Sequence, residues 1–363
     1  MALDRFKLLY ELQDSDSDWS VKRNYLSSNP YLTTEQIDLL YPDESVDKIG
    51  LAQFPKLTDE QFMRLFNDGA KNYLARNPNL TPKQIDLLYD AGGDKDYLAQ
   101  YPKLTDEQFL RLFQDDDVKI IKYLARNPNL TPEQIDLLYQ TVQGVNEKSL
   151  AMNPKLTEKQ FMRFFNDEDF NKDYLASNSN LTTEQIDLLY QTEGVDKDYL
   201  ARNPKLTEEQ FMRLFNEGQN QNADLLFYLA QNSNLTPEQI DLLYQTEGVD
   251  KNLLARYPKL TEKQFMRFFK DGSLHNDNLA ENPNLTTEQI DLLYYTKGVS
   301  WDGQKNLALK PRLTDEQFLR AFNDGRIPLK YNLAQNPSIN PLSNQPFASG
   351  KQPFASGIFN WRW

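Results

Sequence analysis

Apolar and polar positions along this chain follow a helical period, and the same pattern recurs many times. In the stretch NLTPEQIDLLY, Ile135, Leu138 and Tyr139 fall at positions i, i+3 and i+4, so one helix face is apolar. Thr131 is a good N-cap, the proline after it suits the first helical position, and Gln134 completes a capping box. The pattern predicts a helix of about ten residues after each such threonine.

The phrase Leu-Thr-x-x-Gln occurs twelve times, at spacings of 23 to 29 residues. Its threonines are at positions 33, 58, 81, 105, 131, 157, 182, 207, 236, 261, 286 and 314. Two kinds of helix alternate strictly. The EQIDLLY type has glutamine at 36, 84, 134, 185, 239 and 289, and the EQFMRLF type has it at 61, 108, 160, 210, 264 and 317. The full repeat is therefore a pair of units, about 50 residues long.

A shorter segment lies between successive long helices, as in DKDYLARNP at 196–204 and AKNYLARNP at 70–78. Its Tyr-Leu-Ala core is apolar on one side, and the following Asn-Pro or a close variant stops it, because a residue before proline resists the α region. We expect one or two turns of α- or 3₁₀-helix here. Each unit of about 25 residues is then a long helix followed by a short one.

A single unit cannot bury its apolar stripe, so neighbouring units must stack. The predicted fold is an all-α solenoid of about thirteen units, with residues 5–12 as a degenerate first unit. Helix layers roughly 8–10 Å apart would give a rod or arc on the order of 100 Å long. We divide the chain into an N-terminal capping unit (1–31), a repeat solenoid (32–341) and an extended C-terminal peptide (342–363).

The phrase LARNPNLTPEQIDLLY at 124–139, with close copies elsewhere, resembles the leucine-rich repeat variant family. The resemblance covers roughly residues 5–340. It implies alternating α and 3₁₀ helices in a right-handed superhelix, and it implies no chemistry. The chain departs from the family in having mostly tyrosine where the short helix usually carries arginine, and in its strict alternation of two helix types.

The composition argues against several classes of function. With 40 basic and 53 acidic residues, the net charge of −13 disfavours binding to nucleic acid or to anionic membranes. The chain has no cysteine and one histidine, His275, so thiolate chemistry is excluded and an enzyme is disfavoured. Asp271 and Asp277 lie close to His275 in sequence, but we expect solvated surface residues there. We predict no catalytic residue, cofactor, metal site or small-molecule substrate.

The N-terminal stretch is charged and lacks the apolar core of a signal peptide, and no run of 18 apolar residues occurs. We therefore expect a cytoplasmic protein or a component of a particle assembled inside a cell.

Charged residues also follow the alternation of the two helix types. The EQIDLLY helices carry Asp86, Asp136, Asp187 and Asp241, and the facing EQFMRLF helices carry Arg64, Arg111, Arg163, Arg213 and Arg267. These side chains would either line a groove for a polar ligand or pair along a solvated ridge and fix the order of the stack. We favour pairing, which is worth ~0–1 kcal/mol for each exposed pair.

The C-terminal end does not complete a unit. Residues 333–341 resemble the start of another unit, but the chain continues as LSNQPFASGKQPFASGIFNWRW, with a duplicated hexapeptide. We therefore expect the last complete helix, 314–323, to have one flank without a stacking partner. The tail would cover that open end, dock into a partner, or have no role. Its aromatic residues favour a role in binding; they are Phe347, Phe354, Phe359, Trp361 and Trp363.

These observations favour a non-enzymatic solenoid that the tail attaches to a larger protein assembly, such as a virion or another multi-subunit structure. The alternative is a soluble scaffold or adaptor that binds a protein partner on the solenoid face, with the tail as its own cap. An enzyme is the least favoured class.

Overall fold

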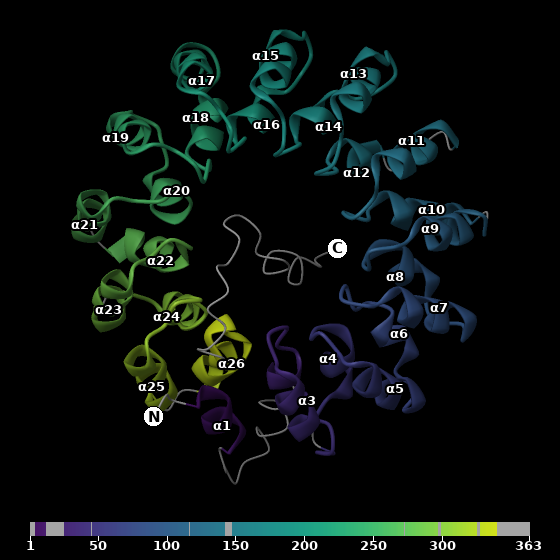
Figure 1. The fold of residues 1–363 in the computed structure, drawn as a ribbon. Coiled ribbons are helices and arrows are strands. Elements are labelled where there is room, and N and C mark those ends of the chain that lie inside the picture. Colours follow the sequence, from purple (N-terminus) through teal and green to yellow (C-terminus); the bar gives the residue numbers. More distant parts are fainter. Residues whose placement is uncertain are drawn as a thin grey trace.

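The computed structural model shows a helical array that returns to its own start and forms a closed ring (Figure 1). The structure describes residues 4–11, 25–44, 46–115, 117–141, 147–271, 273–296, 299–324 and 327–339. In these ranges the regular elements are all helices, arranged as an outer row and an inner row. The all-α solenoid predicted from the repeats is confirmed.

The outer row holds the longer helices (Figure 1). It consists of α1 (Arg5–Tyr10), α3 (Thr34–Leu40), α5 (Asp59–Asn67), α7 (Pro82–Asp90), α9 (Asp106–Phe113), α11 (Pro132–Thr141), α13 (Glu158–Asn166), α15 (Thr183–Gln191), α17 (Glu208–Asn220), α19 (Pro237–Gln245), α21 (Glu262–Asp271), α23 (Thr287–Tyr295) and α25 (Asp315–Asn323). We call α3, α7, α11, α15, α19 and α23 the EQI helices, and α5, α9, α13, α17, α21 and α25 the EQF helices.

The inner row holds the shorter helices, which face the middle of the ring (Figure 1). It consists of a helical turn at 25–27, α4 (Lys48–Gln53), α6 (Lys71–Leu74), α8 (Lys95–Gln100), α10 (Val118–Ala125), α12 (Glu147–Ala151), α14 (Asp173–Ala176), α16 (Lys197–Ala201), α18 (Ala223–Leu229), α20 (Lys251–Arg256), α22 (Ser273–Glu281), α24 (Trp301–Ala308) and α26 (Ile327–Gln335). In the described ranges, one 3₁₀ helix follows them, η1 (Pro337–Ile339). The short helices are thus α-helical rather than an alternation of α with 3₁₀.

Each EQI and EQF helix begins as the sequence predicts. In α7, the Gln84 backbone N–H donates to the Thr81 hydroxyl oxygen at 3.3 Å, and the Thr81 N–H donates to the Gln84 side-chain oxygen at 3.0 Å. The same reciprocal pair occurs at all twelve Leu-Thr-x-x-Gln phrases. Such caps satisfy backbone donors that no helical bond can reach, and they fix the first residue of each helix.

One continuous apolar core runs between the two rows, from Phe6 to Ile339. The outer helices bury the apolar stripe that the sequence predicts, such as Ile135 and Leu138 in α11. The inner helices bury their Leu-Ala pair against it, as Leu200 does in α16. No unit could bury these faces by itself, so the stack of units is what makes the core.

The overall shape differs from the predicted rod or arc. The outer helix α1 lies between α25 and α3, so the first and last units are neighbours (Figure 1). The flank of α25 that we expected to be open is therefore covered by the N-terminal helix. A small rotation at each junction, repeated around the thirteen outer helices of the described ranges, brings the ends together.

Candidate interaction surfaces

Five tail side chains that the sequence proposes as partner contacts lie outside the described residues; they are Phe347, Phe354, Phe359, Trp361 and Trp363. The structure does describe where the tail begins. η1 packs beside α26, and α26 in turn contacts α1. Ile339, the last described residue, is buried. The tail therefore starts at the place where the two ends of the array meet.

The outer part of this meeting place is the contact of α1 with α25. Arg5 is 3% exposed, and its guanidinium donates to one carboxylate oxygen of Asp315 from Nε at 3.0 Å and from Nη2 at 2.8 Å. Nη2 also donates to the Leu313 carbonyl at 2.8 Å, and the guanidinium lies 5.1 Å from the ring centre of Phe318. A charged donor that meets a carboxylate, a carbonyl and an aromatic face makes a strong and directional contact.

This contact uses the same position of α25 that the internal junctions use. Asp315 is the first residue of an EQF helix, and Asp59 is the first residue of α5. The Gln84 side chain of the next EQI helix donates to Asp59 at 2.9 Å. Gln134, Gln185, Gln239 and Gln289 make the same contact with Asp106, Glu158, Glu208 and Glu262. Arg5 therefore replaces the capping-box glutamine, and α1 acts as an EQI helix behind α25.

The inner row closes as well. The Asn29 side chain donates to the Ala334 carbonyl at 2.7 Å and to the Asn336 carbonyl at 3.3 Å. The rings of Tyr25 and Tyr331 stack with centroids 4.6 Å apart. We call the contacts of α1 and residues 25–29 with α25, α26 and η1 the seam. Both rows of helices are continuous across it.

The Asn29 bonds belong to a ladder that runs around the whole ring. One buried asparagine follows most of the short helices, and its side-chain N–H₂ donates to backbone carbonyls of the preceding unit. The asparagine ladder comprises Asn29, Asn77, Asn127, Asn153, Asn178, Asn203, Asn232, Asn282 and Asn336. The sequence predicts the Asn-Pro dipeptide only as a helix stop, whereas its asparagine also ties each unit to the one before.

The seam makes one composite unit from the two ends of the chain. Residues 333–339 provide the end of a short helix and the entry of a unit, but the sequence after them does not repeat the long-helix phrase. α1 occupies the position of that long helix (Figure 1). The sequence shows both incomplete ends, and we did not predict that they join. The sequence feature that could have predicted this join is the similarity of RFKLLY, residues 5–10, to the QIDLLY of the EQI helices.

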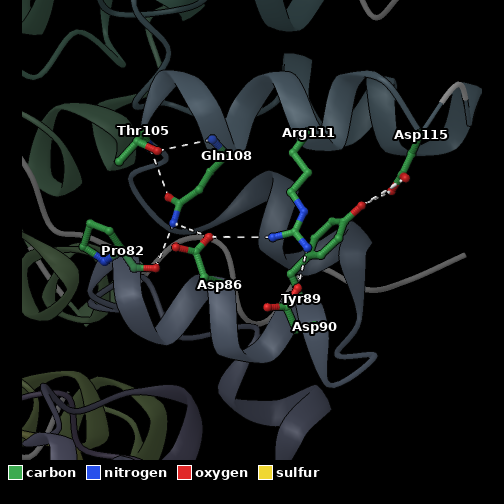
Figure 2. Close-up of polar contacts among 8 residues, drawn as sticks. All are labelled: Pro82, Asp86, Tyr89, Asp90, Thr105, Gln108, Arg111 and Asp115. Carbon is green, nitrogen blue, oxygen red and sulfur yellow. Dashed lines mark hydrogen bonds and ion pairs between the residues drawn. The ribbon is translucent and has the colours of Figure 1, made fainter.

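Figure 2 shows the other kind of junction, from an EQI helix to an EQF helix. Gln108 of α9 donates to the Pro82 carbonyl of α7 at 2.8 Å and to Asp86 at 2.9 Å. Arg111 is hydrogen-bonded to Asp90, lies 4.0 Å from Asp86, and stacks on the ring of the adjacent tyrosine. The apolar contact between the two helices thus continues into a polar ridge that is specific to this junction.

The proposed pairing of aspartate and arginine is confirmed along this ridge. The distance is 2.5 Å for Arg163–Asp136 and 2.8 Å for Arg267–Asp241. Equivalent pairs are Arg64–Asp38, Arg213–Asp187 and Arg320–Asp291. All are partly exposed, so each is worth ~0–1 kcal/mol, and their main effect is to fix which helix follows which.

The tyrosine of each EQI helix joins the same ridge. The Tyr190 hydroxyl donates to Glu217 at 2.6 Å, and Lys197 donates to the same carboxylate at 2.7 Å. Burial, and then the nearby carboxylate, raises the pKa of Tyr190 to about 12. Burial and Asp167 raise the pKa of Tyr139 to the same value. These hydroxyls therefore remain protonated donors to a higher pH than an ordinary tyrosine does.

The inner row carries tyrosine and arginine side chains that are half-buried or exposed. The tyrosines are Tyr73, Tyr97, Tyr123, Tyr174, Tyr199 and Tyr228. Arg76 donates to the Tyr97 hydroxyl at 2.7 Å, and Arg202 lies 4.3 Å from the ring centre of Tyr228 on the next short helix. We call these six tyrosines, with Arg76, Arg126 and Arg202, the inner wall. Tyrosine and arginine are enriched at protein interfaces, so the inner wall is a candidate binding surface.

One position of the asparagine ladder holds a lysine. Lys310 is buried, and its Nζ donates to the Asn282 carbonyl at 2.8 Å, as the asparagine side chains do. Burial lowers the pKa of Lys310 to about 7, and Glu281 opposes that shift weakly. The predictions from sequence did not include this residue, although aligning LALKPRLT with LARNPNLT places the lysine at the asparagine position.

Two equivalent aspartates of the inner row have opposite surroundings. Asp96 of α8 pairs with Lys119 of α10 at 2.5 Å. Asp198 of α16 faces the carboxylates of Asp196 and Asp224 instead. Burial, and then these like charges, raise the pKa of Asp198 to about 6. Asp198 therefore takes up a proton at a higher pH than an ordinary aspartate does.

Candidate metal ligands have structural partners. Asp271 accepts a hydrogen bond from the Tyr244 hydroxyl, and Asp277 accepts one from the Ser300 backbone N–H at 2.7 Å. The backbone of His275 belongs to α22, and its side chain lies outside the described part of the structure. Among the residues that the structure describes, no three histidine or carboxylate side chains are placed to hold a metal ion.

A comparison with protein-family models found no match, and a comparison with curated proteins found no similar protein. The resemblance to leucine-rich repeat variants stays a prediction. Within the described ranges, no helix combines the length and the apolar character that crossing a bilayer requires.

Proposed function

We propose that this chain is a non-enzymatic, ring-shaped scaffold that its C-terminal tail attaches to a larger protein assembly. The observation that carries the proposal is the position of α1. Because α1 already covers the flank of α25, the array needs no further cover from residues 342–363. A tail with two copies of QPFASG and two terminal tryptophans is then available for a partner.

The partner that fits this tail is a protein. Aromatic side chains act as anchors when they enter apolar pockets of a partner, and two copies of one hexapeptide add avidity. The net charge of −13 disfavours nucleic acid and anionic membrane surfaces. A virion or another multi-subunit structure is the kind of assembly that such a scaffold would join.

Removing the tail tests this proposal. Deleting residues 342–363 should abolish recovery of the native complex from lysate, while helical content and melting temperature stay unchanged. Replacing the five tail aromatic residues by alanine should have the same effect. The matched control is Ser349→Ala with Ser356→Ala, which alters both hexapeptides but keeps the aromatic residues. Recovery of the same complex with the truncated chain would refute tail attachment.

The inner wall supports a second candidate, a scaffold that binds a protein partner on the face of the ring. Its tyrosine–arginine contacts, such as Arg202 with Tyr228, place interface-type side chains on the short helices of the inner row. Replacing Tyr199 and Arg202 by serine should then weaken partner recovery while deletion of the tail leaves it intact. The opposite outcome favours tail attachment.

A further inference from the structure

The helix α1 reaches its place in the ring without a short chain connection to the helices it completes. Arg5 and Asp315 are 310 residues apart in sequence, and the contact between them is entirely non-covalent. On its other side, α1 is joined to the rest of the ring through residues 12–24. We call the site beside α25 that α1 occupies the slot; it is formed by Asp315, the Leu313 carbonyl and the Phe318 ring. Any copy of α1 that reaches the slot makes the same contacts.

We propose that α1 exchanges between two copies of this chain, so that each copy's α1 occupies the slot on α25 of the other. The partner is a second copy because the slot selects the features of α1 itself. It offers Asp315 and the Leu313 carbonyl to a guanidinium, and an apolar surface to Phe6 and Leu9, which are both 3% exposed. The exchange is a domain swap in which no contact is new.

The connecting segment is long enough for this exchange. Thirteen residues, 12–24, span at most roughly 45 Å when extended. An outer helix of nine residues, such as α5, is only about 14 Å long. The length of chain between α1 and residue 25 therefore exceeds the length of an outer helix about threefold.

The balance between the closed ring and the exchanged dimer is set by effective concentration. A short tether holds α1 near its own slot at a concentration on the order of millimolar, so the single ring dominates in dilute solution. The fraction of exchanged dimer increases when positions 5 and 315 carry like charges within one chain and opposite charges between two chains. Charge reversal at the seam produces this situation.

Two single variants test the exchange. Arg5→Glu places an acidic side chain against Asp315, and Asp315→Arg places a basic side chain against Arg5, so each variant repels its own α1. In a mixed dimer, the acidic side chain at position 5 of the first variant meets the basic side chain at position 315 of the second. The second variant's Arg5 meets the first variant's Asp315, so both seams are matched. The double variant, Arg5→Glu with Asp315→Arg, restores the match within one chain and is the control.

Light scattering coupled to size exclusion should give twice the monomer mass for the mixture, and the monomer mass for the double variant. The dimer fraction of the mixture should exceed that of either variant alone by roughly tenfold, which corresponds to a difference of about 1.4 kcal/mol. Monomers only in the mixture, or equal dimer in each variant alone, would overturn the proposal. Circular dichroism of each single variant checks that its helices are intact.

A second measurement uses the otherwise unaltered chain, in case charge reversal unfolds it. The chain has no cysteine, so Lys7→Cys in one sample and Glu316→Cys in another give single labelling sites, both exposed. Energy transfer between the labels should appear after the samples are mixed and incubated. Its absence at protein concentrations up to the millimolar range would overturn the exchange. Neither test involves residues 342–363, so its outcome is independent of tail attachment.

Discussion

The junction between α25 and α1 and the junction between α5 and α7 bring the same helix positions together by different means. In the internal junction, one neutral amide of Gln84 donates to Asp59, and the chain joins the two helices through α6. At the seam, the buried Arg5 guanidinium donates from two nitrogens to Asp315 and also donates to the Leu313 carbonyl. No short connection joins α25 to α1.

The difference shows what chain connectivity contributes. Two helices joined by a short segment are already close, so a hydrogen bond from a neutral amide to a carboxylate, together with apolar packing, is enough to hold them. Two ends separated by 310 residues must overcome a larger loss of chain entropy when they meet. In the Arg5–Asp315 contact both the donor and the acceptor are charged, and this stronger contact occurs where no short segment joins the two helices.

The largest expected effect on the free energy of unfolding is that of Arg5→Ala, and its internal counterpart is Gln84→Ala. Arg5→Ala removes the buried guanidinium that donates to Asp315 and to the Leu313 carbonyl. It should lower the free energy of unfolding by about 2–4 kcal/mol. The internal variant removes the hydrogen bond to Asp59 and the one that the Gln84 side chain accepts from the Thr81 N–H, and should lower it by about 1–2 kcal/mol. Urea unfolding measures both costs. Small-angle scattering should show a larger maximum dimension for Arg5→Ala alone, and equal behaviour of the two variants would contradict a special role of the seam.

An intermediate effect is expected at Lys310, in the unit before the seam. Its folded-state pKa of about 7 lies below the ordinary value of 10.5, so folding favours the neutral amine. Below about pH 7 the amine is charged in both states and its burial destabilises the fold fully. Between pH 7 and 10.5 this destabilisation falls steadily, and above about pH 10.5 it is absent because the amine is neutral in both states.

Lys310→Asn restores the ladder residue found at Asn282 and should stabilise the protein by about 1–3 kcal/mol at roughly pH 6 to 7. The advantage should shrink as the pH rises toward about 10. Thermal unfolding of the variant and the parent at about pH 6, 8 and 10 measures it. The matched control is Asn282→Ala, which should destabilise the protein at every pH. A gain that does not depend on pH would show that the charge of the lysine is not its cause.

The smallest effect concerns the second flank of α1. Met63 of α5 and Leu87 of α7 are 38% and 36% exposed, and we expect them to form an apolar pair at this junction. The equivalent of Met63 in α1 is Lys7, and Leu39 of α3 behind it is 46% exposed. Lys7→Met should restore the apolar pair and stabilise the ring by about 0.5–1 kcal/mol. No gain in the urea midpoint would mean that α1 does not pack on α3 in the internal register.

Much of the local structure followed from sequence. Thr81 with Gln84 predicted a helix start, and the alternation of helix types predicted the pairing of Asp136 with Arg163, because these contacts depend on residues close in the repeat. The second role of Asn77 in the ladder, and the lysine that replaces such an asparagine at 310, were missed. Both depend on which carbonyl of the neighbouring unit lies within reach.

The sequence by itself determined the helices, their caps, their order and their apolar faces, since each of these is a property of one unit or of two adjacent units. Tertiary structure alone decided that the array closes. The thirteen outer helices of the described ranges complete a full turn, so each helix is rotated by roughly 28° about the ring axis relative to the one before it. A few degrees more or less, accumulated over the chain, would leave Arg5 far from Asp315. That angle arises from side-chain packing between the rows, which no periodic pattern specifies.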